Sequence, residues 1–479
     1  MSRRTTIVLT IALVLTTIFG VCLLAEVRTV QRPGWFWQIQ DKDMLEIGLI
    51  GAVGFAFPLI VRFVGEGGAG RGKVAVSLVL LVLLSFSLQL ALAFAEKRKV
   101  AGLSDRIVRA GHSEFARTAG KGARPTELVR SYEELVKADD QRYARSKPPG
   151  QLLIYVLMAD LAVKLATFLL PLVAALVILP LFWLATEVGP PGGALWPPLL
   201  YVLAPPTALV TLHLDQSVYP LLSTTLWALA ARAGRARRAV LAWGAALGAL
   251  AWGCLFVSFS LLPALLLAGF FAWSTAAVAH PGSDRWGRLA RLFLGALLAF
   301  LALVVLAWWG LGYDMGQRWQ DAMAHHRQWK RWDGTLNDTV RYAIINSVEF
   351  CYWLGFPLLA LFALDAAWGF QRLVDRLRAW RRGPAGPKTD PPSDPCDRGE
   401  PLLELSGLAT ALLLLSMAVL GTTKSEVARL WIFVIPAVAL AASRCLARLP
   451  GEERDPVATV VAGVQLLWMF LLKAKQDFR

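Results

Sequence analysis

The sequence alternates between long apolar runs and short polar segments. Thirteen runs are long and apolar enough to predict transmembrane helices. They cover residues 7–24, 46–64, 74–95, 166–187, 195–213, 217–231, 239–257, 261–279, 292–312, 350–369, 402–421, 430–447 and 456–472. A bilayer core offers no water to backbone N–H and C=O groups, and these runs do not alternate as barrel strands do. We therefore predict an all-α, polytopic transmembrane helical bundle.

Basic residues gather in five short connections between these runs, at residues 62–73, 232–238, 285–291, 372–382 and 444–454. With thirteen helices and a cytoplasmic N-terminus, all five fall on one side, as the positive-inside rule requires. The first run follows Arg3 and Arg4, and no small-residue cleavage site follows it. We therefore expect a retained signal-anchor helix.

The composition supports a membrane protein: 56% of the residues are hydrophobic, 17% are charged, and the mean hydropathy is +0.52. These values exclude an ordinary soluble domain. The net charge of +15 comes with arginines in short membrane loops, so we expect no nucleic-acid partner. Five cysteines without paired spacing predict neither a disulfide framework nor a zinc site.

The chain divides at residues 383–400, which are rich in Pro, Gly and Asp and predict a disordered cytoplasmic linker. Residues 1–382 form the main transmembrane region, and residues 401–479 supply the helices that complete the bundle. Two longer segments, 96–150 and 313–349, fall on the face opposite the basic connections. Most of the other polar chemistry lies in them.

The segment 96–150 contains an amphipathic stretch that begins at Pro125. Its apolar residues Leu128, Tyr132, Leu135 and Val136 share one face, which predicts a helix on the membrane surface with charges toward solvent. Lys147 follows and stands before Pro148, Pro149 and Gly150, which form a rigid corner leading into the membrane. A lysine there holds an anionic headgroup or snorkels to the interface.

Two further polar clusters lie at the same membrane face. Asp215 and Gln216 stand between apolar runs, where a carboxylate is a functional candidate or an ordinary loop residue. Lys424, Glu426 and Arg429 form a short outer turn, in which Arg429 either pairs with Glu426 or binds a phosphate. Carboxylates beside Lys and Arg suit chemistry on a lipid-linked phosphate, with the carboxylate as general base.

In the second outer segment, His325 and His326 are adjacent and point about 100° apart on a helix, so they do not form a zinc-binding pair. Trp319, Trp329 and Trp332 near them are typical of an interfacial aromatic belt. We predict no metal site, although a divalent cation stays open as a cofactor. No P-loop, GxGxxG, GxSxG or HExxH motif occurs.

A family resemblance runs from about residue 111 to residue 436. Its elements are GHSEF, the amphipathic stretch, SKPPG at 146–150, LDQ at 214–216, LFVSFSLLPALLLAG and EVARLWIFVIP. Together they resemble the C-type (GT-C) membrane glycosyltransferases, in particular bacterial members similar to the protein mannosyltransferase and aminoarabinose transferase group. SKPPG looks like the HPPG variant of such enzymes.

The resemblance implies an enzyme of the bacterial plasma membrane that serves the cell envelope. It would transfer a hexose or pentose, with inversion, from a polyprenyl-phosphate donor to an extracytoplasmic glycan, lipid or protein acceptor. It also implies a catalytic carboxylate in an early outer loop. By position this is Glu114, where most members carry Asp, and Asp43 and Asp105 are alternatives. The substrate-binding candidates are Lys147, Asp215, Gln216, Lys424, Glu426 and Arg429.

Two other functions compete with this one. A transporter or flippase of lipid-linked glycans would use the same basic cavity without chemistry, although no repeat of residues 111–150 occurs later in the chain. A non-catalytic membrane partner in envelope polysaccharide assembly would explain the Glu in place of Asp.

Overall fold

The computed structural model describes most of the chain as helices. The described residues are 3–25, 27, 70–94, 114–115, 118, 124–137, 143–159, 163–189, 193–209, 214–280, 282, 284–382, 403–421, 423–424 and 427–475. No strand occurs among them, and nine of their helical spans are long and apolar enough to cross a membrane. The prediction of an all-helical, multi-pass membrane protein is confirmed at this level.

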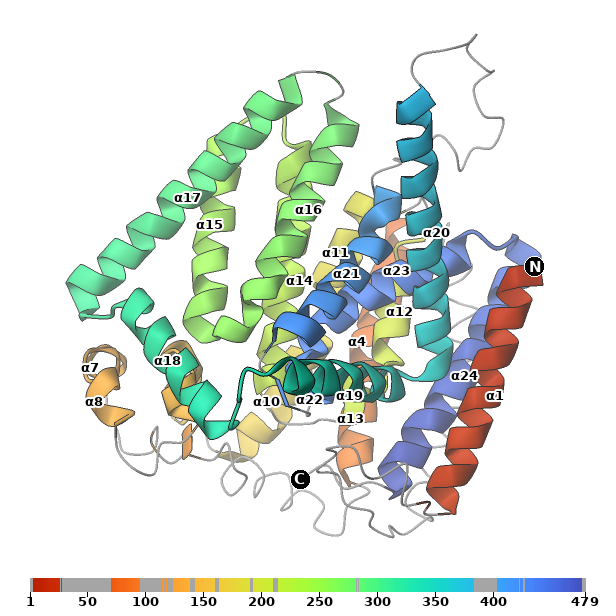
Figure 1. Cartoon of the computed structure of the whole chain (residues 1–479), viewed down its shortest axis with the longest axis horizontal. Helices are drawn as coiled ribbons and strands as arrows, with labels where there is room; N and C mark the ends of the chain where they lie inside the picture. Colours follow the sequence, from red (N-terminus) through yellow and green to blue (C-terminus); the bar gives the residue numbers. More distant parts are fainter. Residues whose placement is uncertain are drawn as a thin grey trace.

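One group of four consecutive helices, each antiparallel to the next along the chain, forms the left half of Figure 1. Its members are α14 (Leu214–Arg235), α15 (Val240–Val257), α16 (Leu262–Ala279) and α17 (Asp284–Leu311). Helix α15 packs along α17, and α14 along α16. A side chain at Gly244 or Gly248 of α15 would meet the backbone of α17. Small residues therefore let these two helices approach closely, as membrane helices commonly do.

The second group joins the two ends of the chain. Helix α1 (Arg3–Leu24) packs against α20 (Phe356–Arg382) and α24 (Gly451–Lys475), while α23 (Ile435–Ala447) packs against α20 and α12. Helix α21 (Ser406–Leu420), introduced by the short η5 (Leu403–Leu405), packs against α20, α19 and α23. The C-terminal helices thus belong to the same bundle as α1. The predicted linker at 383–400 lies outside the described residues.

Several predicted helices differ from the observed ones. The predicted run 166–187 is confirmed as a span over Thr167–Val188, in which α10 (Val163–Ala175) and α11 (Ile178–Val188) follow each other. The run 195–213 is not one helix, because Pro205 begins a new short one; it contains α12 (Trp196–Val202) and α13 (Pro205–Leu209). In the run 430–447, α22 (Val427–Leu430) and η6 (Ile432–Val434) precede α23. Helix α4 (Arg71–Phe94) matches its prediction, and the run 46–64 lies outside the described residues.

Most of the predicted outer segment 313–349 is helical. It contains α18 (Met315–Trp329) and the start of α19 (Leu336–Leu354), which runs crosswise to α1 and α24 in the lower half of Figure 1. Gly355 turns the chain from α19 into α20 with a φ of 84°, a conformation that favours glycine. The predicted helix 350–369 is therefore wrong at its start, since residues 350–354 belong to α19.

The predicted amphipathic surface helix is also corrected. It breaks at Ser131 into α7 (Pro125–Arg130) and α8 (Tyr132–Leu135). Leu128, Tyr132 and Val136 are buried in a cluster with Phe115 and residues of α9 (Gly150–Ala159). The apolar face that we expected to lie on lipid packs on protein instead.

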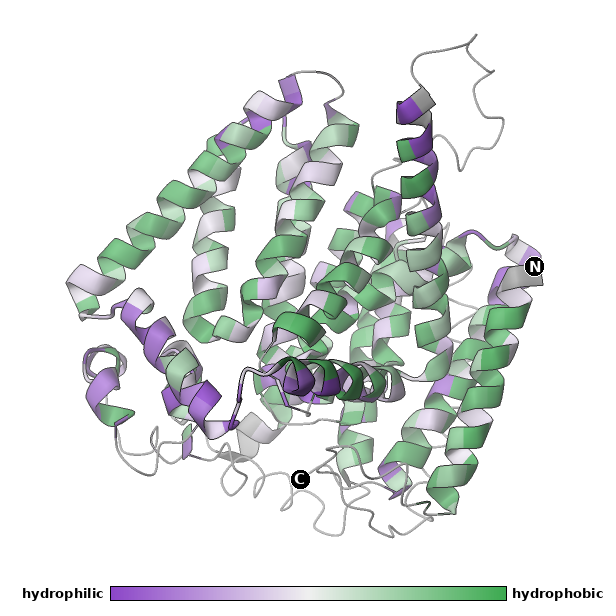
Figure 2. Ribbon diagram, viewed as in Figure 1, coloured by the Kyte–Doolittle hydropathy of each residue, from purple (hydrophilic) through white to green (hydrophobic). Residues whose placement is uncertain are grey.

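The described basic connections gather at one end of the bundle. The α14–α15 and α16–α17 connections lie at the top of Figure 1, where α20 also ends. Figure 2 shows hydrophilic residues at the upper ends of α17 and α20 and apolar residues along most of their length. Arg372 and Arg448 both contact Glu404, which brings the 372–382 and 444–454 connections together.

Candidate functional site

A cavity of about 460 Å³ lies at the end of the bundle opposite the basic connections. It is formed where α14, α16, α18, α21 and α22 meet the corner before α9. Three of the predicted site residues line it: Lys147, Asp215 and Arg429. The structure thus brings together side chains from three distant parts of the sequence.

The corner that carries Lys147 is held by backbone contacts. It connects η2 (Ala144–Ser146) to α9. The Tyr132 hydroxyl lies 3.1 Å from the carbonyl oxygens of Ala144 and Lys147 and 3.3 Å from that of Pro148. Burial raises the pKa of the Tyr132 phenol, so it stays a neutral donor to these acceptors.

Gly150 is required at this corner by a close approach rather than by the sharp turn that the sequence suggested. A side chain at Gly150 would collide with the backbone carbonyl of Phe256 on α15. The start of α9 is therefore pressed against α15, which fixes the position of Lys147 three residues earlier.

Lys147 reaches from this corner to α14. Its Nζ lies 3.4 Å from the hydroxyl of Tyr219 and 5.5 Å from the centre of that ring. The Tyr219 hydroxyl in turn donates to Gln151 Oε1 at 3.3 Å. Tyr219 is one helical turn after Asp215, so both side chains lie on the face of α14 that meets Lys147.

Asp215 and Arg429 form an ion pair at the cavity, with 3.4 Å between Asp215 Oδ2 and Arg429 Nε. Their side chains are 4% and 16% exposed. Within the described part of the chain, the buried Asp215 Oδ1 accepts no hydrogen bond. A donor group entering the cavity would satisfy it. Glu426, one partner that the sequence offered for Arg429, lies outside the described residues.

One wall of the cavity is aromatic. Trp319 and Trp329 of α18 line it, with the Trp319 ring edge-on to Phe259 at 5.0 Å and the Trp329 ring edge-on to Tyr143 at 5.1 Å. The prediction that these tryptophans belong to an interfacial belt stays a prediction. They reach the cavity because α18 packs on η2 and because Trp319 contacts Phe259 of η3 (Phe259–Leu261), just before α16.

The opposite wall is apolar and faces the surface. It includes Leu262 and Leu266 of α16 and Leu413, Met417 and Leu420 of α21. Leu266 is 68% exposed and Leu420 is 81% exposed, although both line the cavity. The cavity therefore opens between α16 and α21, on the surface that lipid would cover.

Glu114 lies behind the corner rather than in the cavity. It is buried, and its Oε1 accepts a hydrogen bond of 2.5 Å from the backbone N–H of Ala144 in η2. Glu114 does not line the cavity. Tyr143 and Ser146, at the two ends of η2, do line it. The two alternative carboxylates, Asp43 and Asp105, lie outside the described residues.

Gln216 and Lys424 are also outside the cavity wall. Gln216 is buried and donates to the carbonyl of Thr207 at 2.8 Å. Lys424 pairs with Asp338 of α19 at 2.6 Å and lies over the rings of Trp332 and Tyr342. Gln216 thus connects α14 to α13, and Lys424 connects the segment after α21 to α19. Both residues support the elements around the cavity and do not line it.

Arg318 of α18 is a supporting residue that sequence reasoning missed. It is buried, pairs with Glu133 of α8 at 2.9 Å and donates to the carbonyl of Arg145 in η2 at 2.8 Å. Burial raises the pKa of Glu133, and Arg318 opposes that rise. An arginine inside a polar helix gives no sequence signal of such a contact. Tyr219, by contrast, could have been found from its spacing to Asp215.

No group of three or more His, Cys, Asp or Glu side chains that could hold a metal ion occurs in the part of the chain that the structure describes. His326 lies at the cavity with its ring 6.3 Å from that of Trp329.

Comparison with known proteins finds no family model that matches this chain, and no curated protein or solved structure that matches it.

Proposed function

We propose that this protein is a membrane glycosyltransferase that transfers a sugar from a polyprenyl-phosphate donor to an acceptor, with inversion. One observation carries the proposal: a single cavity combines two cations and a carboxylate with an apolar wall that opens toward lipid. A lipid-linked phosphate has the matching parts, an anionic group and a long apolar chain.

In this proposal Lys147 and Arg429 bind the donor phosphate. Arginine offers a planar fork of N–H donors and lysine a compact charge, and both suit phosphate oxygens. The isoprenoid chain would lie between α16 and α21, along Leu266 and Leu420. The sugar would lie toward Trp319 and Trp329, whose faces suit the C–H surface of a sugar ring.

The reaction breaks the bond between the anomeric carbon and the phosphate oxygen while an acceptor hydroxyl attacks from the opposite side. The electron pair goes to the leaving phosphate, whose charge Lys147 and Arg429 stabilise. The hydroxyl proton goes to a carboxylate base. Two carboxylates compete for that role: Glu114, favoured by the family resemblance but placed behind η2, and Asp215, which lines the cavity with Oδ2 engaged by Arg429.

The basic end of the bundle would face the cytoplasm, together with the N-terminus, in a bacterial plasma membrane. The span α15 (Val240–Val257) has 18 residues, about 27 Å at 1.5 Å per residue, which is close to the thickness of the hydrocarbon core and separates the basic end from the cavity end. The cavity would then face the extracytoplasmic side, where the acceptor is a glycan, lipid or protein.

The test is a transfer assay on the purified chain with a panel of polyprenyl-phosphate hexoses and pentoses. Lys147→Ala should raise the KM for the donor about 10- to 100-fold, because one charge-assisted hydrogen bond contributes roughly 1.5–3 kcal/mol. Lys137→Ala is the matched control, since this nearby lysine is exposed and does not line the cavity. An unchanged KM in Lys147→Ala would contradict the assigned phosphate site.

The base is assigned in the same assay by comparing Glu114→Gln with Asp215→Asn. The variant that lacks the base should lose about 10²- to 10⁴-fold in kcat. If lipid-linked glycan crosses reconstituted vesicles and no sugar is transferred from any donor, the protein is a flippase and the proposal is wrong.

A further inference from the structure

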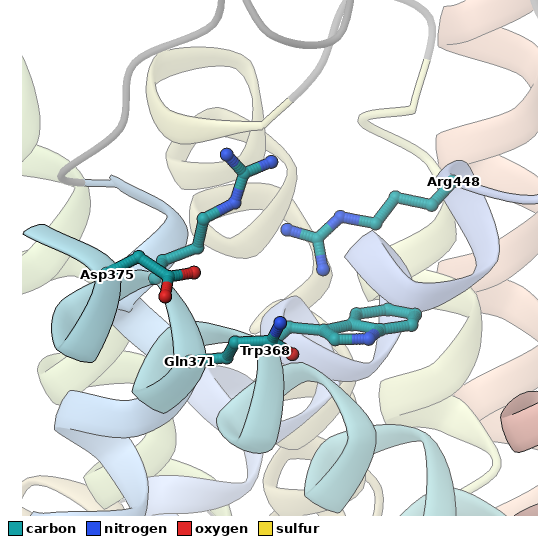
Figure 3. Close-up of a pocket in the computed structure, with 5 residues that line it drawn as sticks. Trp368, Gln371, Asp375 and Arg448 are labelled. Atoms are coloured by element: carbon teal, nitrogen blue, oxygen red, sulfur yellow. The ribbon is translucent and has the colours of Figure 1, made fainter.

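A second pocket, of about 360 Å³, lies at the basic end of the molecule, far from the cavity described above. It is lined by Trp368, Gln371, Arg372 and Asp375 of α20 and by Arg448, which directly follows α23. Figure 3 shows the Arg448 side chain extending over the pocket toward the Trp368 ring.

The two arginines of this pocket share one carboxylate. Arg372 Nε lies 3.4 Å from Glu404 Oε2, and Arg448 Nη2 lies 3.8 Å from Glu404 Oε1. The Arg448 guanidinium is also 4.6 Å from the centre of the Trp368 ring. Both guanidinium groups are therefore held beside the pocket, one by stacking and both by Glu404.

The lining of the pocket contains more positive than negative groups: two arginines, Arg372 and Arg448, and one carboxylate, Asp375. Asp375 is itself paired with Arg378 at 3.5 Å. An anion in the pocket would meet N–H donors of two guanidinium groups from two directions.

The depth of the pocket indicates what kind of anion it takes. The apolar span of α20 is Phe356–Arg378, so the pocket residues of α20 lie in its last turns. Phe370 and Leu377 of the same helix are exposed, which indicates contact with lipid at this level. Headgroup phosphates occupy the depth at which a spanning helix ends.

We propose that this pocket binds the phosphate of an anionic lipid headgroup from the leaflet at the basic end. Arg372 and Arg448 contact the phosphate oxygens, Gln371 donates to the headgroup, and the acyl chains lie along the exposed residues Phe370, Ala367 and Ala363 of α20. The site is separate from the cavity and does not depend on the proposed transfer activity.

The experiment measures lipid binding by the full-length chain purified in detergent. Thermal unfolding is followed while dioleoyl-phosphatidylglycerol, dioleoyl-phosphatidylcholine or millimolar inorganic phosphate is added, and native mass spectrometry counts the lipids retained. Phosphatidylglycerol should raise Tm and give one strongly retained lipid, whereas phosphatidylcholine and inorganic phosphate should not.

Two variants and a control test the residues. Arg372→Gln should raise the lipid concentration for half-saturation about fivefold, as expected for one basic residue at an anionic surface. Arg372 is 52% exposed, so this variant should fold. Trp368→Leu should weaken binding as well, because Arg448 loses its stacking partner. Arg381→Gln removes an exposed charge from the same helix outside the pocket and should bind as the unaltered chain does.

Equal binding by Arg372→Gln, Trp368→Leu and Arg381→Gln would overturn the site. An equal Tm shift with phosphatidylcholine would show that the anionic headgroup is not recognised. An equal shift with inorganic phosphate alone would show a free-phosphate site, and the lipid assignment would be wrong.

Discussion

The two ends of the bundle each contain a buried cluster of opposite charges, and the clusters differ in the length of their closest ion pair. At the basic end, Asp365 of α20 is fully buried and contacts Arg444 at 2.6 Å and Arg448 at 3.4 Å. Arg444 also donates to the backbone carbonyls of Leu403 and Glu404. One carboxylate and one guanidinium thereby connect α20, α23 and η5.

In the cavity the closest ion pair is longer. Asp215 and Arg429 lie 3.4 Å apart, Lys147 contacts Tyr219 at 3.4 Å, and Asp215 Oδ1 accepts no hydrogen bond from the residues that are described. A buried charge is stable only when its partners offset the lost hydration. We infer from this contrast that Asp365 serves the fold, and the proposed function assigns Asp215, Lys147 and Arg429 to ligand binding.

The largest expected effect is at Asp365. Asp365→Asn keeps the shape of the side chain. It removes the charged partner that the described residues give Arg444 and leaves Arg448 with Glu404. The variant should lose about 3–5 kcal/mol of stability, the range for breaking a buried ion pair. Thermal unfolding in detergent measures it, with Asp375→Asn as the control because Asp375 and Arg378 form an exposed pair. A loss at Asp365 no greater than at Asp375 would break the comparison.

The sequence did not reveal this cluster, and the reason is physical. Asp365 lies within the predicted apolar run 350–369, where a single charge changes the average hydropathy of the run very little. Arg444 belongs to a connection whose arginines we explained by the positive-inside rule. Only the packing of α20 on α23 brings the two residues together. Hydropathy does predict the bundle and most spanning helices, because the bilayer requires long apolar helices whatever their neighbours are.

The position of Lys147 at the cavity depends on a close backbone contact at Gly150, and a substitution there tests this. Gly150→Ala would press a methyl group against the carbonyl of Phe256, an overpacking that costs roughly 1–3 kcal/mol. Gly253→Ala of α15 is the matched control, because open space surrounds that position. Unfolding of both variants gives the difference. Equal stability would show that the corner carrying Lys147 is not fixed by this contact.

The sequence found part of the candidate site. Lys147, Asp215 and Arg429 stand out because few charges lie at the ends of the apolar runs opposite the basic connections. The structure brings these three residues to one cavity. Glu114, Gln216 and Lys424 were chosen by the same argument or by resemblance, yet they contact η2, Thr207 and Asp338. These partners lie 30, 9 and 86 residues away, respectively, and none has a helical i to i+4 spacing. No spacing rule therefore separates a ligand-binding polar residue from one that joins two elements of the fold.

A smaller effect on stability is expected at Asp215. Asp215→Asn should cost about 1 kcal/mol, as for a pair that solvent reaches, because Arg429 is partly exposed and the contact is long. Thermal unfolding beside Asp365→Asn compares the same chemical change at the two ends of the bundle. A loss equal to that of Asp365→Asn would show that both clusters serve the fold, and the contrast between them would disappear.

The smallest effect is expected at Asp333, an exposed charge outside both clusters. Its side chain accepts hydrogen bonds from the backbone N–H and the hydroxyl of Thr335, the residue that caps α19, and these bonds hold the pKa of Asp333 below its ordinary value of 3.8. The contribution to α19 is therefore present above pH 3.8 and is lost as pH falls through the lower value of the folded state. Hydrogen exchange at residues 335–338, compared with α18, should show this loss of protection. Asp333→Asn keeps a hydrogen-bond acceptor but has no charge, so the exchange protection of residues 335–338 in this variant should not fall at low pH. The same fall in protection in Asp333→Asn would assign the effect to Asp338 instead.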